Sequence, residues 1–218
     1  RTFERYVAPS VVSEILSSPE EADAILRGRL LPVTVLFCDI KGFTTLTKRR
    51  TETGQAQELV EQLNQYLGEM VEVITAHGGT VDKFIGDCVV AVFGSPVSRG
   101  VSEEAVAALT CAKAMGQSLE RLNQGWLPRG IEPLGNGIGL ASGEVVVGQI
   151  GSPRRMEFTV IGDKVNLAAR LEALTRKLGV NVLFDESTKQ LAKDDLAVRH
   201  LGLQPIRGAG EIDVYTLA

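Results

Sequence analysis

Two aspartates, Asp39 and Asp87, stand at the ends of predicted strands and are candidates for a shared site. Asp39 directly follows the apolar and β-branched run 33–38, and Asp87 lies where two further strands, 80–85 and 88–93, meet. Two carboxylates at neighbouring strand ends repel each other unless a cation lies between them. Mg²⁺ is commonly held by one or two carboxylates together with substrate phosphates. The alternative is that both residues only form turns, as aspartate often does.

Asn166 and Arg170 are a second candidate pair, because they lie four residues apart in a predicted helix over 163–178 and therefore share one face. Asparagine is a weak helix former, so a mid-helix position suggests a task for its amide. Arg170 is then placed to reach a bound phosphate. A solvent-exposed arginine beside a cap-like asparagine explains the same residues equally well.

Three further cations are candidates for anion contacts. Lys83 lies in an apolar strand, where a lysine needs a partner or extends its ammonium group to solvent. Arg154 and Arg155 form a basic pair in a loop rich in glycine, proline and serine. In an acidic protein such a pair suits an anion, although an exposed arginine pair is more often plain surface.

The elements that position these residues alternate between strands and helices, and several neighbouring strands are joined as hairpins. This pattern predicts an α+β fold in which helices pack against one sheet. The core is expected to begin at Leu31 and to run to the C-terminus as one domain, 31–218. The expected helices are 59–74, 102–122, 163–178 and 187–191, and the expected strands are 33–38, 80–85, 88–93, 138–141, 145–150, 158–161, a short one near 182, 198–201 and 212–216.

The first residues, 1–30, differ from the rest and are expected to form a helical linker or coupling segment. Apolar residues recur there at helical spacing, and Pro19 follows a pair of serines as a stop signal. The segment suits either a packing arm or a link to an upstream module. The chain opens at Arg1, without a methionine, so we expect it to be part of a longer protein.

The amino-acid composition argues against several classes of function. The 218 residues carry 23 Lys and Arg against 27 Asp and Glu, a net charge of −4, which argues against a nucleic-acid partner. No apolar run approaches the roughly 20 residues of a membrane helix, so no membrane contact is expected. The three widely spaced cysteines form neither a disulfide framework nor a zinc motif, and a cytoplasmic domain is expected, whether or not its parent is membrane-attached. The P-loop, HExxH and GxSxG motifs are absent from the sequence.

Taken together, three stretches make the sequence similar to the catalytic domain of class III nucleotidyl cyclases. They are LFCDIKGFT (36–44), GTVDKFIGDC (79–88) and EFTVIGDKVNLAAR (157–170), in the order and spacing of that family. The resemblance spans 31–218. It implies a ferredoxin-like core with a mostly antiparallel sheet, a head-to-tail homodimer with two shared active sites, ATP as substrate, and two Mg²⁺ or Mn²⁺ ions per site.

The resemblance also assigns roles to individual residues. Asp39 and Asp87 match the metal-binding aspartates, with the carbonyl of Ile40 as a further ligand. Asn166 matches the residue that positions the ribose, and Arg170 the arginine that stabilises the transition state. Lys83, contributed by the other subunit, matches the base-selecting lysine. The remaining substrate-binding positions are Thr159, Phe43, Thr44, Arg154, Arg155 and Arg207.

The identity of the base can also be argued from hydrogen bonding. Lys83 only donates, so it favours the acceptor N1 of adenine over the N–H of guanine, and Thr159 can accept from the adenine 6-amino group. The Lys–Thr pair resembles the threonine-containing branch of bacterial adenylyl cyclases, whereas guanylyl cyclases usually carry glutamate with a small residue or cysteine. A guanylyl cyclase remains the alternative within the class.

One departure from the family pattern leaves an alternative function open. Many family members carry a second basic residue in a C-terminal turn that binds the triphosphate, but this turn reads Arg207-Gly-Ala-Gly210, and Ala209 cannot bind phosphate. A catalytically silent, nucleotide-binding signalling domain is therefore the rival from another class. An upstream sensory module is expected in either case. The related diguanylate cyclases are disfavoured, because the hairpin lacks a GGDEF-type turn.

Overall fold

The computed structural model describes residues 28–152, 155–193 and 195–218. The expected helical segment 1–30 lies almost entirely outside these ranges, as does Arg154. The strands are β1 (Arg29–Ile40), β2 (Thr80–Ile85), β3 (Cys88–Phe93), β4 (Asn136–Ser152), β5 (Arg155–Ile161), β6 (Val182–Asp185), β7 (Val198–Ile206) and β8 (Gly210–Leu217). The helices are α3 (Phe43–Glu52), α4 (Ala56–Ala76), α5 (Val101–Trp126), the short 3₁₀ helix η2 (Leu127–Arg129), α6 (Asp163–Leu178) and α7 (Glu186–Ala192).

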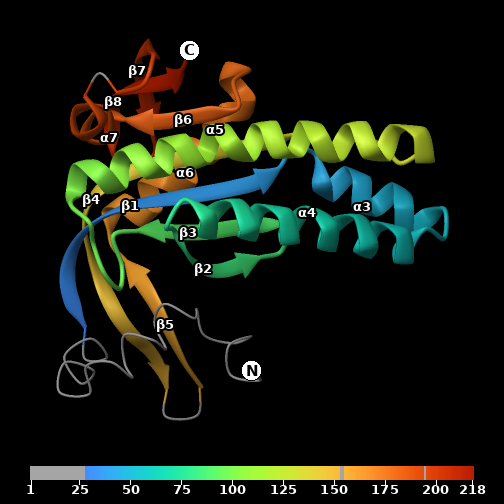
Figure 1. The fold of residues 1–218 in the computed structure, drawn as a ribbon, viewed down its shortest axis with the longest axis horizontal. Helices are drawn as coiled ribbons and strands as arrows, with labels where there is room; N and C mark the ends of the chain where they lie inside the picture. The colour runs from blue at the N-terminus through green and yellow to red at the C-terminus, as the bar shows by residue number, and fades with distance from the viewer. Residues whose placement is uncertain (1–27, 153–154, 194) are drawn as a thin grey trace.

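These strands form one sheet in the order β2-β3-β1-β4-β6-β8-β7, with β5 paired to β4 as a projecting hairpin (Figure 1). All pairings are antiparallel except that of β4 with β6. Along the chain, helices separate β1 from β2 and β3 from β4, while β2 and β3 form a hairpin. With the sheet order β2-β3-β1-β4, this is the arrangement of a ferredoxin-like fold. The predicted α+β class and ferredoxin-like core are thus confirmed.

Strand β1 lies inside the sheet between β3 and β4, and its two faces are covered by different helices. Its side chains alternate between the faces, as the pleat of a strand requires. Leu36 and Cys38 pack in the cluster formed with α4 and α5. Val35 and Phe37 pack in the cluster formed with α6. Asp39, two residues after Phe37, is therefore directed to the α6 side of the sheet.

Helix α6 approaches β4 unusually closely because β4 carries glycine at the contact. A Cβ atom on Gly139 would lie 2.2 Å from the backbone oxygen of Ala168 and from the backbone nitrogen of Glu172. A Cβ atom on Gly137 would lie 2.3 Å from Oγ1 of Thr175. Since main-chain atoms cannot rotate away, only glycine permits this distance between helix and strand.

Two elements differ from the sequence expectations. The segments 138–141 and 145–150, predicted as separate strands, belong to the single strand β4, which pairs with β1 without a break from Asn136 to Val147. Gly143 stays extended in the strand and leaves room for the Lys164 side chain, which a Cβ atom would contact at 2.8 Å. Helix α3 was not predicted, because its polar sequence shows little helical periodicity.

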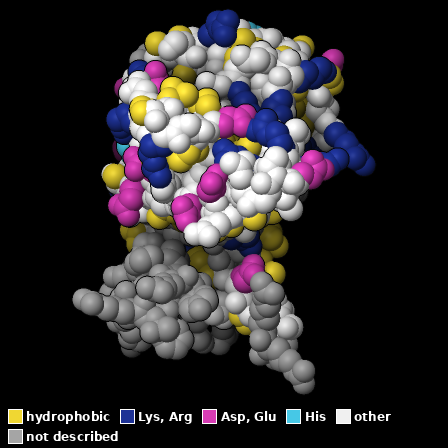
Figure 2. All heavy atoms as spheres, turned by 90° about the vertical axis from the view of Figure 1, so that its right-hand side faces the viewer, with side chains coloured by type: hydrophobic (Ala, Val, Ile, Leu, Met, Phe, Trp, Pro, Cys, Tyr) yellow, Lys and Arg dark blue, Asp and Glu magenta, His cyan; other side chains and the backbone are white. Residues whose placement is uncertain are grey.

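The face of the molecule at which the ends of α3, α4 and α5 lie (Figures 1 and 2) carries charges of both signs. Figure 2 shows Lys and Arg interspersed with Asp and Glu on this face, with hydrophobic side chains in small patches. In the described ranges, no helix combines the length and the apolar character needed to cross a membrane.

The contact between α6 and β4 yields the first prediction. Gly139→Ala places a methyl group against main-chain atoms, so we expect the free energy of unfolding to fall by about 2–3 kcal/mol. Gly116→Ala is the control, because Gly116 lies in α5 with no neighbouring atom within 4 Å of an added Cβ. That change should leave stability unchanged or raise it by up to about 1 kcal/mol. Urea denaturation measures both, and equal stabilities for the two variants would contradict this account of the packing.

Candidate active site

Asp39 and Asp87 lie close together, as the sequence predicted. Asp39 is the penultimate residue of β1, Asp87 follows the end of β2, and the antiparallel pairing of β1 with β3 brings them side by side. The backbone N–H of Ile40 donates to Oδ2 of Asp87 at 3.2 Å. Burial, and then the neighbouring charge of Asp39, raises the pKa of the Asp87 carboxyl to about 6. Two carboxylates that destabilise each other's charge in this way fit a divalent cation.

A cation from the protein also reaches this pair, and sequence reasoning missed it. Arg176 of α6 forms an ion pair with Asp39, although the two residues are 137 positions apart. Its Nη2 lies 3.6 Å from Oε1 of Glu172, one helical turn earlier. The only sequence signal was this Glu–Arg spacing of four residues, which is common on exposed helices and did not point to the site.

Glu172 is the third acid at this end of the sheet. The residue is 7% exposed, and its Oε1 accepts no hydrogen bond from the described residues. Burial, followed by the charge of Asp39, raises the pKa of the Glu172 carboxyl to about 7. Within the described residues no group of three or more His, Cys, Asp or Glu is arranged to hold a metal ion. A cation held by Asp39 and Asp87 would therefore need further oxygen ligands, such as main-chain carbonyls, substrate phosphates or water.

The two residues expected to contact the base are joined through a residue that the sequence analysis did not single out. Thr159 of β5 donates from Oγ1 to Oδ2 of Asp82 at 2.9 Å. Lys83 Nζ lies 3.8 Å from the same oxygen and donates to Oε2 of Glu157 at 2.9 Å. The pairing of β2 with β3 shifts by one residue between Val81 and Lys83, so Asp82 is the extra residue of a β-bulge.

Asn166 and Arg170 lie on α6, as predicted. Asn166 is exposed and Arg170 is half-buried. A Cβ atom on Gly208 would lie 3.0 Å from Nη1 of Arg170, so the Arg170 guanidinium rests on the β7–β8 turn, next to the exposed Arg207. The β7–β8 turn, in which Ala209 stands where many family members have a basic residue, is thus adjacent to Arg170.

The remaining expected residues lie at the start of α3 and of β5. Phe43 and Thr44 open α3, Gly42 before them has a left-handed φ of 74°, and the first turn carries no acidic residue. A helix N-terminus of this kind has free N–H groups that suit a phosphate. Arg155 is the first residue of β5.

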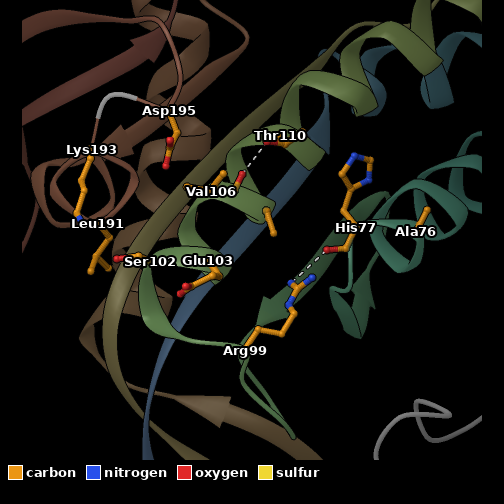
Figure 3. Close-up of a pocket in the computed structure, with 11 residues that line it drawn as sticks. Ala76, His77, Arg99, Ser102, Glu103, Val106, Thr110, Leu191, Lys193 and Asp195 are labelled. Atoms are coloured by element: carbon orange, nitrogen blue, oxygen red, sulfur yellow. Dashed lines mark hydrogen bonds between the residues drawn. The ribbon is translucent and has the colours of Figure 1, made fainter.

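A pocket of about 570 Å³ lies elsewhere, between the end of α4, the start of α5 and the region after α7 (Figure 3). Its lining includes Arg99, whose guanidinium donates to the carbonyl of His77 at 3.3 Å and forms an ion pair with the buried Glu104. None of the residues expected to bind metal or nucleotide lines it. The candidate residues instead lie along β1, the start of α3, the β2–β3 hairpin, β5, α6 and the β7–β8 turn.

Comparison with known proteins is decisive for the family. A family model described as the adenylate and guanylate cyclase catalytic domain matches residues 27–218. The chain belongs to this family. It is similar to adenylate cyclase 1 of Rhizobium meliloti, with 34% identity over 84% of the chain, and to an adenylate cyclase of Anabaena cylindrica, with 35% over 85%. It spans only 27% and 36% of the lengths of these two relatives.

Solved cyclase structures share the fold of this domain. The adenylyl cyclase CyaB of P. aeruginosa superposes with a TM-score of 0.81 at 36% identity, covering 88% of this chain and 96% of that one. The guanylyl cyclase Cya2 superposes with a TM-score of 0.76, also at 36% identity, covering 88% and 93%. Because both activities occur at equal identity, the choice between adenine and guanine has to be argued from the side chains of this cyclase domain.

The buried Glu172 makes the stability of the cyclase domain depend on pH. Its pKa is near 7 when folded and about 4.5 when unfolded, so between these values the native state holds a proton that the unfolded chain has released. The free energy of unfolding therefore falls as pH rises through this window, by about 3 kcal/mol from this group.

We expect Glu172→Gln to remove this part of the pH dependence, because glutamine does not ionise. Urea denaturation of both proteins at about pH 5 and pH 8, with a chelator present, measures the difference. The variant should gain stability relative to the parent at the higher pH. An unchanged difference between the two pH values would contradict the assigned cost of ionising Glu172.

Proposed function

We propose that this domain is an adenylyl cyclase that converts ATP into 3′,5′-cyclic AMP and pyrophosphate. The observation that carries the proposal is that Lys83 and the Thr159 hydroxyl meet at one oxygen of Asp82, to which the hydroxyl donates. Lys83 can only donate, and Thr159 in this arrangement can only accept. These two groups match N1 and the 6-amino group of adenine, and they mismatch N1–H and O6 of guanine.

The reaction is an in-line displacement in which the ribose 3′-oxygen attacks the α-phosphorus and pyrophosphate leaves. Asp39, Asp87 and the carbonyl of Ile40 hold the metal, proposed as two Mg²⁺ or Mn²⁺ ions. When bound, these ions supply Lewis-acid chemistry that lowers the pKa of the 3′-hydroxyl and offsets phosphate charge. Arg176 forms an ion pair with Asp39 and so offsets part of the negative charge at this end of the site.

The protein's own groups orient the substrate. The N–H groups around Phe43 and Thr44 and the cations Arg154, Arg155 and Arg207 are proposed to hold the triphosphate. The Asn166 amide fixes the ribose so that its 3′-oxygen is aligned for attack. The Arg170 guanidinium donates to the α-phosphoryl oxygens as negative charge grows there.

A homodimer with shared sites is part of the proposal. The strands that carry Lys83 and Thr159 also expose large apolar side chains, namely Phe84 at 49%, Ile85 at 55% and Met156 at 48%. Exposed apolar groups beside a polar site are typical of a surface that a partner covers. A second copy bound there would close a site that is open in one chain. An upstream sensory module is proposed to control this assembly.

Turnover with each nucleotide tests the function. We expect cyclic AMP from ATP with Mn²⁺ and with Mg²⁺, and much less cyclic GMP from GTP. Specific activity should rise with protein concentration, because two chains form each site. Preferential cyclic GMP formation would establish the guanylyl alternative. Nucleotide binding without any cyclic product, at all concentrations, would favour the silent signalling domain.

Mixing two inactive variants tests the metal site and the shared architecture together. Asp39→Ala and Arg170→Ala should each abolish turnover, the first by loss of a metal ligand and the second by loss of transition-state stabilisation. If one chain supplies the metal site and its partner supplies Arg170, the mixed dimer has one intact site. Random pairing then restores about a quarter of the parental activity.

The matched control is a mixture of Asp39→Ala with Asp87→Ala, which damages the same half of every site and should stay inactive. Circular dichroism and sedimentation confirm that all variants keep their fold and dimer. An inactive mixture of Asp39→Ala with Arg170→Ala would refute the shared site. Retained activity in either aspartate variant would refute the metal assignment.

A further inference from the structure

Asp82 lies behind the two residues proposed to contact the base. Its side chain is 7% exposed, and its Oδ2 accepts the Thr159 hydroxyl at 2.9 Å while lying 3.8 Å from Lys83 Nζ. Adjacent residues of a regular strand point to opposite faces. The β-bulge at Asp82 breaks this alternation, so that Asp82 and Lys83 both reach toward β5.

This contact determines the direction of the Thr159 hydroxyl. A free threonine hydroxyl rotates and can either donate or accept. An ionised carboxylate only accepts, so the proton of Thr159 must point toward Asp82. The lone pairs left on Oγ1 then face away from Asp82 and can only receive a hydrogen bond. Burial raises the pKa of Asp82, while the Thr159 hydrogen bond and the Lys83 charge act in the opposite direction, toward the ionised form.

Threonine alone would not discriminate between the purines. A rotating hydroxyl could accept from the 6-amino group of adenine or donate to O6 of guanine equally well. When the hydroxyl already donates its proton to Asp82, its lone pairs face the lone pairs of guanine O6, and no hydrogen bond can form between the two oxygens. Discrimination between adenine and guanine at Thr159 therefore requires Asp82, which accepts the hydroxyl proton.

We propose that Asp82 is a positioning residue for nucleobase selection, which converts Thr159 into a pure acceptor and so excludes guanine. This inference rests on the proposed function, in which Lys83 and Thr159 contact the base. Asp82 itself does not touch the nucleotide. Its role is separate from that of Lys83, which selects at N1.

Selectivity, measured as the ratio of kcat/KM for ATP to that for GTP, is the test. Asp82→Ala should lower this ratio about tenfold, roughly the effect of one hydrogen bond, mainly through better use of GTP. Asp82→Asn keeps the shape of the side chain, and its amide can donate to Thr159 and free the hydroxyl proton. The ratio should therefore fall in the same direction, which covers the case that Asp82→Ala does not fold.

A double-mutant cycle separates this role from a structural one. Thr159→Val removes the hydroxyl, so Asp82→Ala should change the ratio no further in that background. Glu157→Gln is the charge control, because Glu157 also bonds Lys83, whereas the Thr159 hydroxyl is donated to Asp82. This variant should leave the ratio within about twofold of the parent, well below the effect of one hydrogen bond.

Three results would overturn the inference. In the first, Asp82→Ala reduces the use of ATP and GTP by the same factor. In the second, its effect on the ratio persists in the Thr159→Val background. In the third, Glu157→Gln lowers the ratio as much as Asp82→Ala does.

Failure of the proposed function looks different from failure of this inference. A parent protein that makes no cyclic product would refute the cyclase, and the same ratios are then measured as dissociation constants for ATP and GTP by calorimetry. An unchanged ratio in Thr159→Val would refute the base contact and the role of Asp82 together. A lowered ratio in Thr159→Val, with an unchanged ratio in Asp82→Ala, would refute the role of Asp82 alone.

Discussion

The backbone contact between α6 and β4 is the constraint on which the rest of the candidate site depends. Gly139 lets the backbone of the helix lie against the strand, and Gly137 leaves room for the Thr175 side chain. This close approach brings Glu172 and Arg176 to the end of β1, where Asp39 and Asp87 stand. The same helix carries Asn166 and Arg170 and rests Arg170 on the β7–β8 turn. One helix position thus determines the surroundings of the acids and the place of the arginine.

Most of the strands and helices could be predicted from local sequence patterns. The strands β2 and β3 and the helix α6 could be predicted at their observed boundaries, because their periodicity and turn residues act within a few positions. Strand β4 could not, because Ser142-Gly143 looks like a turn and only its pairing with β1 and the packing of Lys164 keep it extended. Helix α3 escaped prediction for the opposite reason, since no apolar stripe distinguishes it from a loop.

The residues of the candidate site could be predicted only where they fall within the three family motifs. The motifs supplied Asp39, Asp87, Lys83, Thr159, Asn166 and Arg170, but not the groups that adjust them. Arg176 reaches Asp39 across 137 positions of sequence, and Asp82 meets Thr159 only because a bulge turns it toward β5. Contacts of this kind depend on the assembled tertiary structure, so periodicity and spacing in one sequence do not show them.

The bulge at Asp82 also separates the needs of the sheet from those of the neighbouring strand β5. Val81 pairs with Ala91 and Lys83 pairs with Val90, so Asp82 is an extra residue that the ladder itself does not use. Deleting it would leave Lys83 opposite Val90 and the tip at Gly86-Asp87 beside Ile40. The shortened strand would therefore keep its place in the sheet and lose only the contact with Thr159.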